Sequence, residues 1–311
     1  MSDGAFPRDR HLTAIALAYR NPDASYIADA VLPRVPVGST SFDYYSYPLG
    51  TAFDVPTTKV GEKSQVNRVE IGGTRVASFT EDYGIEIPLS ANDIKAAAPG
   101  TDPAEKATEY ATDIVMRDRE VRVANLCFDP AKYDAANKID LSGVANGQWS
   151  DPASDPLRYI RTKLDTCVMR PNVLVFGQAT WSAFSMNAKV VKAANGNDGG
   201  EGVAARARIA ELLEVAEILV GSSFYNTVKP GKTPVLARAW GKHALAFYRD
   251  RAVSTAGGIT FGITAEFDSR VAGRKDADIG LRGGIAVRSG ESVRELVLAP
   301  AAAFFFQNAT A

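Results

Sequence analysis

The chain has 311 residues, of which 46% are hydrophobic and 23% charged, and this ordinary globular composition argues against a disordered chain, a collagen or a coiled-coil rod. The 35 basic and 36 acidic side chains leave a formal net charge of −1, which disfavours a protein that coats DNA or RNA and permits self-association. The length predicts about two domains of ~150 residues each.

The first 40 residues are predicted to form an arm without a core of its own. His11–Arg20 fits a short helix, because Leu12, Ile15, Ala16 and Tyr19 fall on one face. The stretch that follows contains Pro33 and Pro36, which argue against a helix there and favour extended backbone. Such an arm needs the body of the protein, or a neighbouring molecule, to lie against.

Residues 41–90 are predicted to form a long β-hairpin. Two β-prone runs flank a polar, glycine-containing tip at 57–65. The tip and its flanks carry Lys59, Glu62, Lys63, Arg68, Glu70 and Arg75. This density of charge, with few large apolar residues near the tip, predicts a hairpin that projects from the core. An ordinary solvated edge hairpin is the alternative.

A long helix is predicted over residues 102–128. Asp102 fits the N-cap, Pro103 the first turn and Glu105 a capping box, and Asp129-Pro130 ends the helix. The apolar stripe is predicted to consist of Ala107, Tyr110, Ile114, Val121, Ala124 and Phe128. At 1.5 Å per residue such a helix is ~40 Å long, far longer than an average globular helix.

Residues 130–155 read as a loop, and a domain boundary is placed there. Residues 155–250 alternate helical and strand patterns, which predicts helices packed on a central sheet. Trp181, Phe184 and Trp240 are expected in its core. The remaining chain is predicted to be β, with strands at 259–267, 281–287 and 293–306 and a charged turn at Arg270–Asp278.

No catalytic, cofactor-binding or metal-binding residues are predicted. His11 and His243 are the only histidines, and no HExxH or zinc-type spacing occurs. Gly231-Lys232-Thr233 fails as a phosphate loop, because residue 226 is Asn and Pro234 follows. Cys127 and Cys167 are interpreted as buried small residues. The apolar stretch Leu296–Phe306 is too short to span a bilayer, and no secretory signal is recognised.

Several short strings occur in a particular order along the chain. They are Tyr26–Pro33 with Val35–Val37, Pro171–Phe176 followed by Trp181, Ile209–Val215 leading to Val220-Gly221 and Tyr225-Asn226, Trp240–Lys242 with Tyr248, and Val293–Pro300. Together with the arm, hairpin, long helix and α/β layer, these strings resemble the major capsid protein of tailed bacteriophages, which has the Hong Kong 97 type fold, and especially its Mu-like head subunits.

The resemblance implies an α+β fold with named parts. The expected parts are an N-terminal arm at 1–40, an E-loop hairpin with flanking peripheral-domain strands at 41–90, a peripheral domain with a spine helix at 91–154, an α/β axial domain at 155–255, and returning peripheral strands with a final axial segment at 256–311. The spine helix is expected to include Asp102, Tyr110, Ile114 and Val121. Assembly contacts are expected from the charged hairpin residues and from the arm residues Tyr26, Ile27, Leu32, Pro33 and Val35.

The implied function is a structural one, without enzyme activity or cofactor. Hexamers and pentamers of the chain are expected to form the icosahedral head around the double-stranded DNA genome, in a virion assembled in the host bacterial cytoplasm. Because the arm starts almost at Met1, a separate scaffold or protease protein is expected, with a portal, a decoration protein, weak non-specific contact with packaged DNA, and no membrane. The alternatives are an encapsulin-type compartment, which assembles around protein cargo, and an α/β enzyme, which would have to use His243.

Overall fold

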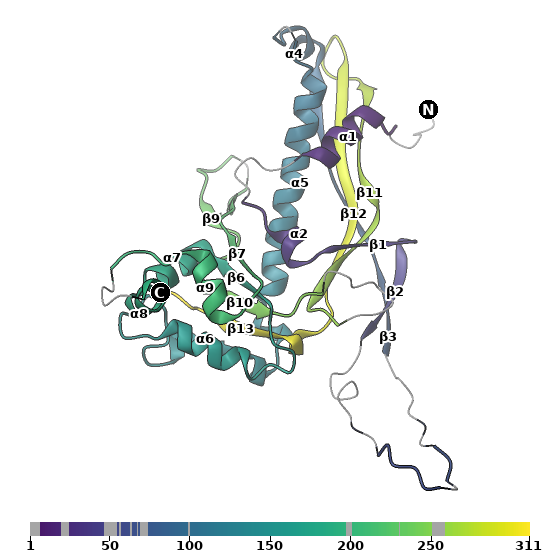
Figure 1. The fold of residues 1–311 in the computed structure, drawn as a ribbon. Helices are drawn as coiled ribbons and strands as arrows, with labels where there is room; N and C mark the ends of the chain where they lie inside the picture. Colours follow the sequence, from purple (N-terminus) through teal and green to yellow (C-terminus); the bar gives the residue numbers. More distant parts are fainter. Residues whose placement is uncertain are drawn as a thin grey trace.

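The computed structural model describes residues 7–19, 25–46, 55, 57–62, 64–66, 68, 74–98, 100–196, 201–229, 231–250 and 259–311. Two sheets organise these residues, one elongated and one central to a compact α/β layer (Figure 1). A separate hairpin extends away from both.

The elongated sheet has the strand order β1-β11-β12-β4. Its centre is the antiparallel pair β11 (Gly262–Ala277) and β12 (Gly284–Val297), and β4 (Glu81–Ser90) pairs antiparallel with β12. The short strand β1 (Arg34–Val37) runs parallel to β11. Helices α1 (Arg10–Ala18), α4 (Ala91–Lys95) and α5 (Pro103–Cys127) complete this part, with α5 lying along the sheet (Figure 1).

The second sheet has the order β5-β13-β10-β6-β7, and Figure 1 shows its helices grouped around it. Its strands are β5 (Lys138–Asp140), β6 (Val173–Gly177), β7 (Glu217–Gly221), β10 (Ala244–Phe247) and β13 (Ala303–Gln307). The helices are α6 (Pro156–Leu164), α7 (Gln178–Met186), α8 (Ala188–Asn195) and α9 (Arg206–Leu213). A small hairpin of β8 (Phe224–Asn226) and β9 (Leu236–Arg238) leaves the edge of this layer, and single turns of 3₁₀ helix lie at Pro130–Lys132, Ala135–Asn137, Leu141–Gly143 and Pro300–Ala302.

Both faces of the second sheet are buried. Phe304 and Phe306 point into one hydrophobic cluster with α6, α7, α8 and α9, whereas Phe305 points into a second cluster with the N-terminal arm and the C-terminal part of α5. These phenylalanines point to alternate faces of the sheet because successive side chains of a strand point in opposite directions. It also explains why strands such as Val173–Gly177 are apolar throughout.

The predicted α+β architecture is confirmed, but four local predictions are wrong. The arm contains a one-turn helix, α2 (Ala28–Val31), because a proline restricts only the residue before it and the turn ends at Leu32. The predicted turn at Arg270–Asp278 is mostly strand β11. The predicted strand at 293–306 is divided between β12 and β13 by the 3₁₀ turn at Pro300–Ala302. Glu105 forms no capping box and instead contacts His11 at 2.7 Å.

The buried face of α5 also differs from the predicted stripe. Ala107 and Ala124 are buried as expected, but Tyr110 is 61% exposed, and Ile114 and Val121 are only half-buried. The buried face of α5 is made of small residues in its first half, Ala104, Ala107, Thr108, Ala111 and Thr112, and farther along of Val115, Arg119, Glu120 and Val123. Small side chains let the helix approach the sheet closely, as the 3.0 Å contact of Thr112 Oγ1 with Ser289 Oγ illustrates.

The chain enters the second layer earlier than the predicted boundary at 155. β5 pairs with β13, and Leu141 and Trp149 are buried in the hydrophobic cluster of this layer. Gly, Asn and Asp are frequent in this stretch and favour a loop, although its backbone supplies the edge strand β5.

Candidate assembly surfaces

The hairpin of β2 (Ser41–Ser46) and β3 (Thr74–Phe79) is a two-stranded sheet that joins neither large sheet. The described residues beyond these strands, 55, 57–62, 64–66 and 68, lie far from the body (Figure 1). Lys59, Glu62 and Arg68 are exposed, and Arg75 forms an ion pair with Asp43 across the strands. Lys63 and Glu70 lie outside the described residues. Val55 and Val66 are 93% and 72% exposed, so the hairpin offers both apolar and charged side chains to a partner.

The arm, in contrast, is fixed to its own chain by a buried carboxylate. Glu120 of α5 is fully buried and accepts hydrogen bonds from the backbone N–H groups of Ile27 and Ala28, each at 2.8 Å, and from the Trp240 indole at 2.5 Å. Burial raises the pKa of this carboxyl, against the lowering effect of its donors. Glu120 therefore joins the arm, the long helix and the second layer at one point.

The predicted arm residues are placed largely inside the subunit. Ile27, Leu32 and Val35 are buried against the same chain, which corrects the expectation that they face a neighbour, and Pro33 is half-buried. Tyr26 is also half-buried, and its hydroxyl donates to Asp113 Oδ1 at 3.0 Å. The apolar pattern of residues 27–35 marked them as contacts but could not distinguish the chain's own body from another copy.

An ionic network that is buried except at the half-exposed Asp29 holds the arm to the long sheet. Arg34 contacts Asp29 at 2.7 Å, Glu266 at 2.5 Å and the fully buried Glu291 at 2.9 Å. Arg119 pairs with the same Asp29, and Arg270 reaches Glu291 at 3.1 Å. Burial tends to raise the pKa of Asp29, but Arg119 and Arg34 outweigh it and lower the pKa to about 2. Periodicity could not predict this network, because Arg119 and Glu120 interrupt the apolar face of α5.

The predicted core residues of the α/β layer are buried, but not all in one cluster. Trp181 and Phe184 of α7 lie in the cluster between the sheet and its helices. Trp240 lies in the cluster on the opposite face, where it contacts Phe128 edge to face at 5.3 Å between ring centroids. Trp240 therefore packs at the junction with the long helix. At the other end of this helix, the N-cap Asp102 accepts from Ala104 N at 2.8 Å.

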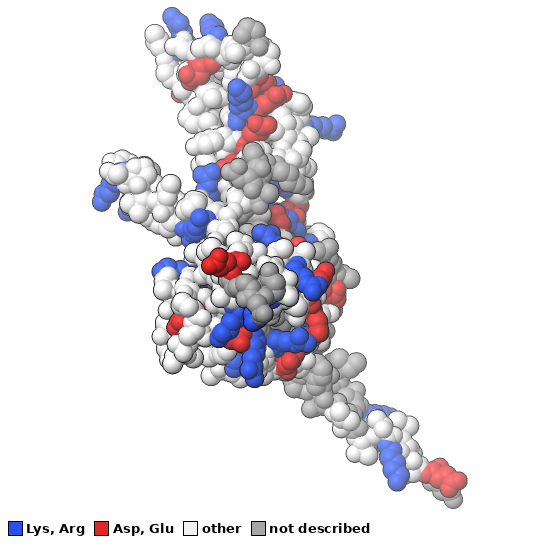
Figure 2. Space-filling view, turned by 60° about the vertical axis from the view of Figure 1, so that its left-hand side comes forward, with Lys and Arg blue, Asp and Glu red and all other residues white. Residues whose placement is uncertain are grey.

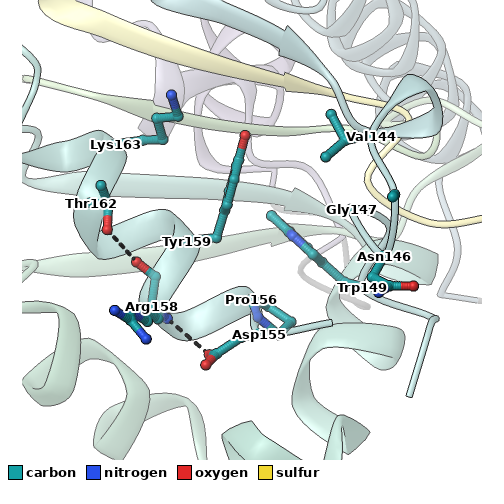
Figure 3. A pocket seen from close by; sticks show the side chains of 11 residues that line it. Val144, Asn146, Gly147, Trp149, Asp155, Pro156, Arg158, Tyr159, Thr162 and Lys163 are labelled. Atoms are coloured by element: carbon teal, nitrogen blue, oxygen red, sulfur yellow. Dashed lines mark hydrogen bonds between the residues drawn. The ribbon is translucent and has the colours of Figure 1, made fainter. Parts of the chain in front are cut away.

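A pocket of about 350 Å³ lies between α6 and the loop before it (Figure 3). The rings of Trp149 and Tyr159 face each other across it, Val144 lines the loop side, and Lys163 extends from the next turn of α6 (Figure 3). Asp155 caps α6 by accepting from Arg158 N at 3.3 Å. This site was not predicted from the sequence, where its signal is Trp149, a large aromatic residue inside a predicted loop.

Charges of both signs are mixed over the surface. In the view of Figure 2, Lys and Arg side chains lie beside Asp and Glu side chains over the body, and the projecting hairpin also carries both signs. Among the described residues, no group of three His, Cys, Asp or Glu side chains could hold a metal ion. The described helices include none that combines the length and apolarity needed to cross a membrane.

The histidines are engaged in structural contacts. His11 contacts Glu105, and this hydrogen bond raises its pKa. His243 Nδ1 accepts from Asn308 N at 3.0 Å, and burial lowers its pKa. Neither histidine lines the pocket beside α6.

Comparison with known proteins identifies the class. No family model matches the chain. It is 49% identical over 312 residues to the major capsid protein of Pseudomonas phage JBD67, covering 100% of both chains. It is 24% identical to the major capsid protein of Burkholderia phage BcepMu over 257 residues, 77% of this chain and 76% of that one.

Solved structures share the fold. A phage-related protein from Bordetella bronchiseptica matches with a TM-score of 0.77 at 21% identity, over 98% of this chain and 99% of its own. The capsid protein of cyanophage P-SCSP1u matches with a TM-score of 0.59 at 12% identity, over 100% and 92%. A Synechococcus elongatus encapsulin is a more distant match, with a TM-score of 0.53 at 11% identity, over 100% and 92%.

The fold is therefore the Hong Kong 97 type capsid fold, confirming the resemblance. The chain belongs to the family of bacteriophage major capsid proteins, as the full-length 49% identity shows. It is a structural protein of the virion that assembles with copies of itself into an icosahedral shell, and the family is non-enzymatic.

Proposed function

We propose that the hairpin between Ser41 and Phe79 is the E-loop and that it joins each subunit to a neighbour in hexamers and pentamers around the genome. The observation that carries this proposal is that β2 and β3 pair only with each other while the described tip residues stay exposed. An isolated two-stranded hairpin is marginal in water, so an extended one gains stability by lying on another surface.

The other parts follow from the same assignment. The elongated sheet with α5 is the peripheral domain and its spine, and the layer around the second sheet is the axial domain. The arm acts chiefly as an internal brace, since Glu120 and Arg34 hold it to its own subunit. A separate scaffold or protease, a portal and a decoration protein complete assembly, and the near-neutral surface limits contact with DNA to weak, non-specific attraction.

Deletion of Lys59–Gln65 tests the E-loop. The described residues in this tip are exposed, so the subunit is expected to keep its melting temperature while forming far fewer shells by electron microscopy. A variant with the same seven positions replaced by Gly and Ser is the matched control for length. If the chemistry of the tip matters, the control fails as the deletion does, and normal shells from the deletion would contradict the assignment.

A further inference from the structure

The pocket beside α6 is lined by more basic than acidic side chains. Arg158 and Lys163 line it, and in the described parts of the chain neither side chain is paired with a carboxylate. Asp155 is the one acid among its described lining residues, and Asp155 Oδ1 already accepts from Arg158 N as the helix cap. Positive charge is therefore left over at the pocket.

The indole N–H of Trp149 adds a buried donor. Trp149 is 1% exposed, and its ring packs against Phe184 and Phe306 at centroid distances of 5.4 and 5.7 Å. Its Nε1 has no acceptor among the described residues, whereas the comparable Trp240 indole donates to Glu120. Buried donors are nearly always paired, so this N–H favours an occupant of the pocket that carries an acceptor.

The remaining walls fit a short acidic side chain. The Lys163 ammonium lies 5.7 Å from the centre of the Tyr159 ring and 5.4 Å from that of Phe304, which places the charge at an aromatic rim. Val144, Pro156 and Tyr159 supply apolar surface for methylene groups. A carboxylate has two oxygens, so it can accept from the Lys163 ammonium and from a second donor beside it.

We propose that this pocket receives an Asp or Glu side chain from a neighbouring copy of the chain in the shell. Within a shell, copies hold one another at high effective concentration, so a carboxylate of the same chain is the most available occupant. Glu62, Glu109 and Glu201 are exposed and have no ion-pair partner among the described residues, so suitable carboxylates exist. The site is separate from the E-loop, and its test does not depend on that assignment.

Zero-length carbodiimide crosslinking tests the occupant directly. Shells are assembled from equal amounts of ¹⁴N- and ¹⁵N-labelled subunits, treated with the reagent, digested and analysed by mass spectrometry. The expected product is an isopeptide between Lys163 and an Asp or Glu, with mixed-isotope pairs that establish an intersubunit link. Crosslinks of Lys163 only within one chain, only to another protein, or absent altogether would overturn the proposal.

Substitutions of Lys163 distinguish a role in contacts between subunits from a role in folding of the subunit. Lys163→Met removes the charge but keeps most of the side-chain length, and Lys163→Arg keeps the charge. We expect Lys163→Met to lower shell yield or shell melting temperature while leaving the melting temperature of the free subunit unchanged, and Lys163→Arg to restore assembly. Arg161→Gln is the matched control on the same helix, because Arg161 pairs with Glu214 outside the pocket. Equal assembly of Lys163→Met, Lys163→Arg and wild type would contradict the proposal.

Discussion

Glu120 connects three parts of the molecule through its own hydrogen bonds. It accepts from the arm at Ile27 and Ala28 and from Trp240 in the second layer, and it is itself part of the long helix. Each of these donors is buried, so removing the acceptor leaves them unpaired. The residue is therefore important to the placement of the arm even though it lies far from the exposed surfaces.

Glu120→Ala is expected to lower the free energy of unfolding by about 3 kcal/mol, because a buried donor left without a partner costs ~1–3 kcal/mol. Urea denaturation followed by tryptophan fluorescence measures this loss, and limited proteolysis should detect cleavage in residues 7–35. Glu109→Ala, an exposed position on the same helix, is the matched control and should change stability by no more than ~0.5 kcal/mol. Equal stability of the two variants would contradict the role of Glu120.

The lowered pKa of Asp29 predicts that the folded protein loses stability in acid. Its pKa is lowered in the folded protein from 3.8 to about 2, so between these values the unfolded chain binds more protons than the folded one. The stability that Asp29 contributes is therefore fully present above the unfolded pKa and is lost as the pH falls through about 2. Melting temperatures measured in steps from neutral pH downward should fall less steeply for Asp29→Asn than for wild type, and identical slopes would contradict this sign.

At the scale of elements, the ends of the long helix were predictable and its buried face was not. Asp102 and Pro103 set its start and Pro130 its stop by local backbone chemistry, so the predicted span agrees with Pro103–Cys127. The buried face depends on the partner surface, and here close packing favours Ala and Thr over larger side chains such as Tyr110 and Val121. Arg119 and Glu120 are buried because the arm and β11 supply their partners, information that no local window contains.

The same distinction applies to the proposed site. The projecting hairpin was predictable from charge and turn residues, because an exposed element needs little tertiary information. The pocket beside α6 was not, since it depends on Trp149 packing against strands and helices distant in sequence.

The junction between β6 and the segment at Trp240 has no room for a side chain. A Cβ at Gly177 would lie 2.0 Å from the Trp240 carbonyl oxygen and 2.1 Å from that of Gly241. Gly177→Ala therefore forces β6 and the backbone at Trp240 apart. We expect it to lower the free energy of unfolding by ~1–3 kcal/mol, measured by thermal or urea unfolding. Gly38→Ala, where nothing lies within 4 Å, is the matched control. A Gly177→Ala protein as stable as this control would contradict the packing described here.

At the scale of the whole molecule, the N-terminal arm and the hairpin are placed differently. The arm and the hairpin were both expected to rely on neighbours, but the arm is buried on its own subunit and the hairpin is not. A net charge of −1 with mixed surface charge avoids strong repulsion between copies, which suits a protein whose principal partner is itself.

Electron microscopy of the purified protein, expressed alone and together with the proposed scaffold protein, shows whether the chain builds a virion shell. We expect capsomers or closed icosahedral shells in at least one of the two preparations. Small uniform shells that enclose only a protein cargo would instead indicate an encapsulin-type compartment. A stable monomer that forms neither capsomers nor shells in either preparation would contradict the assignment to a virion shell.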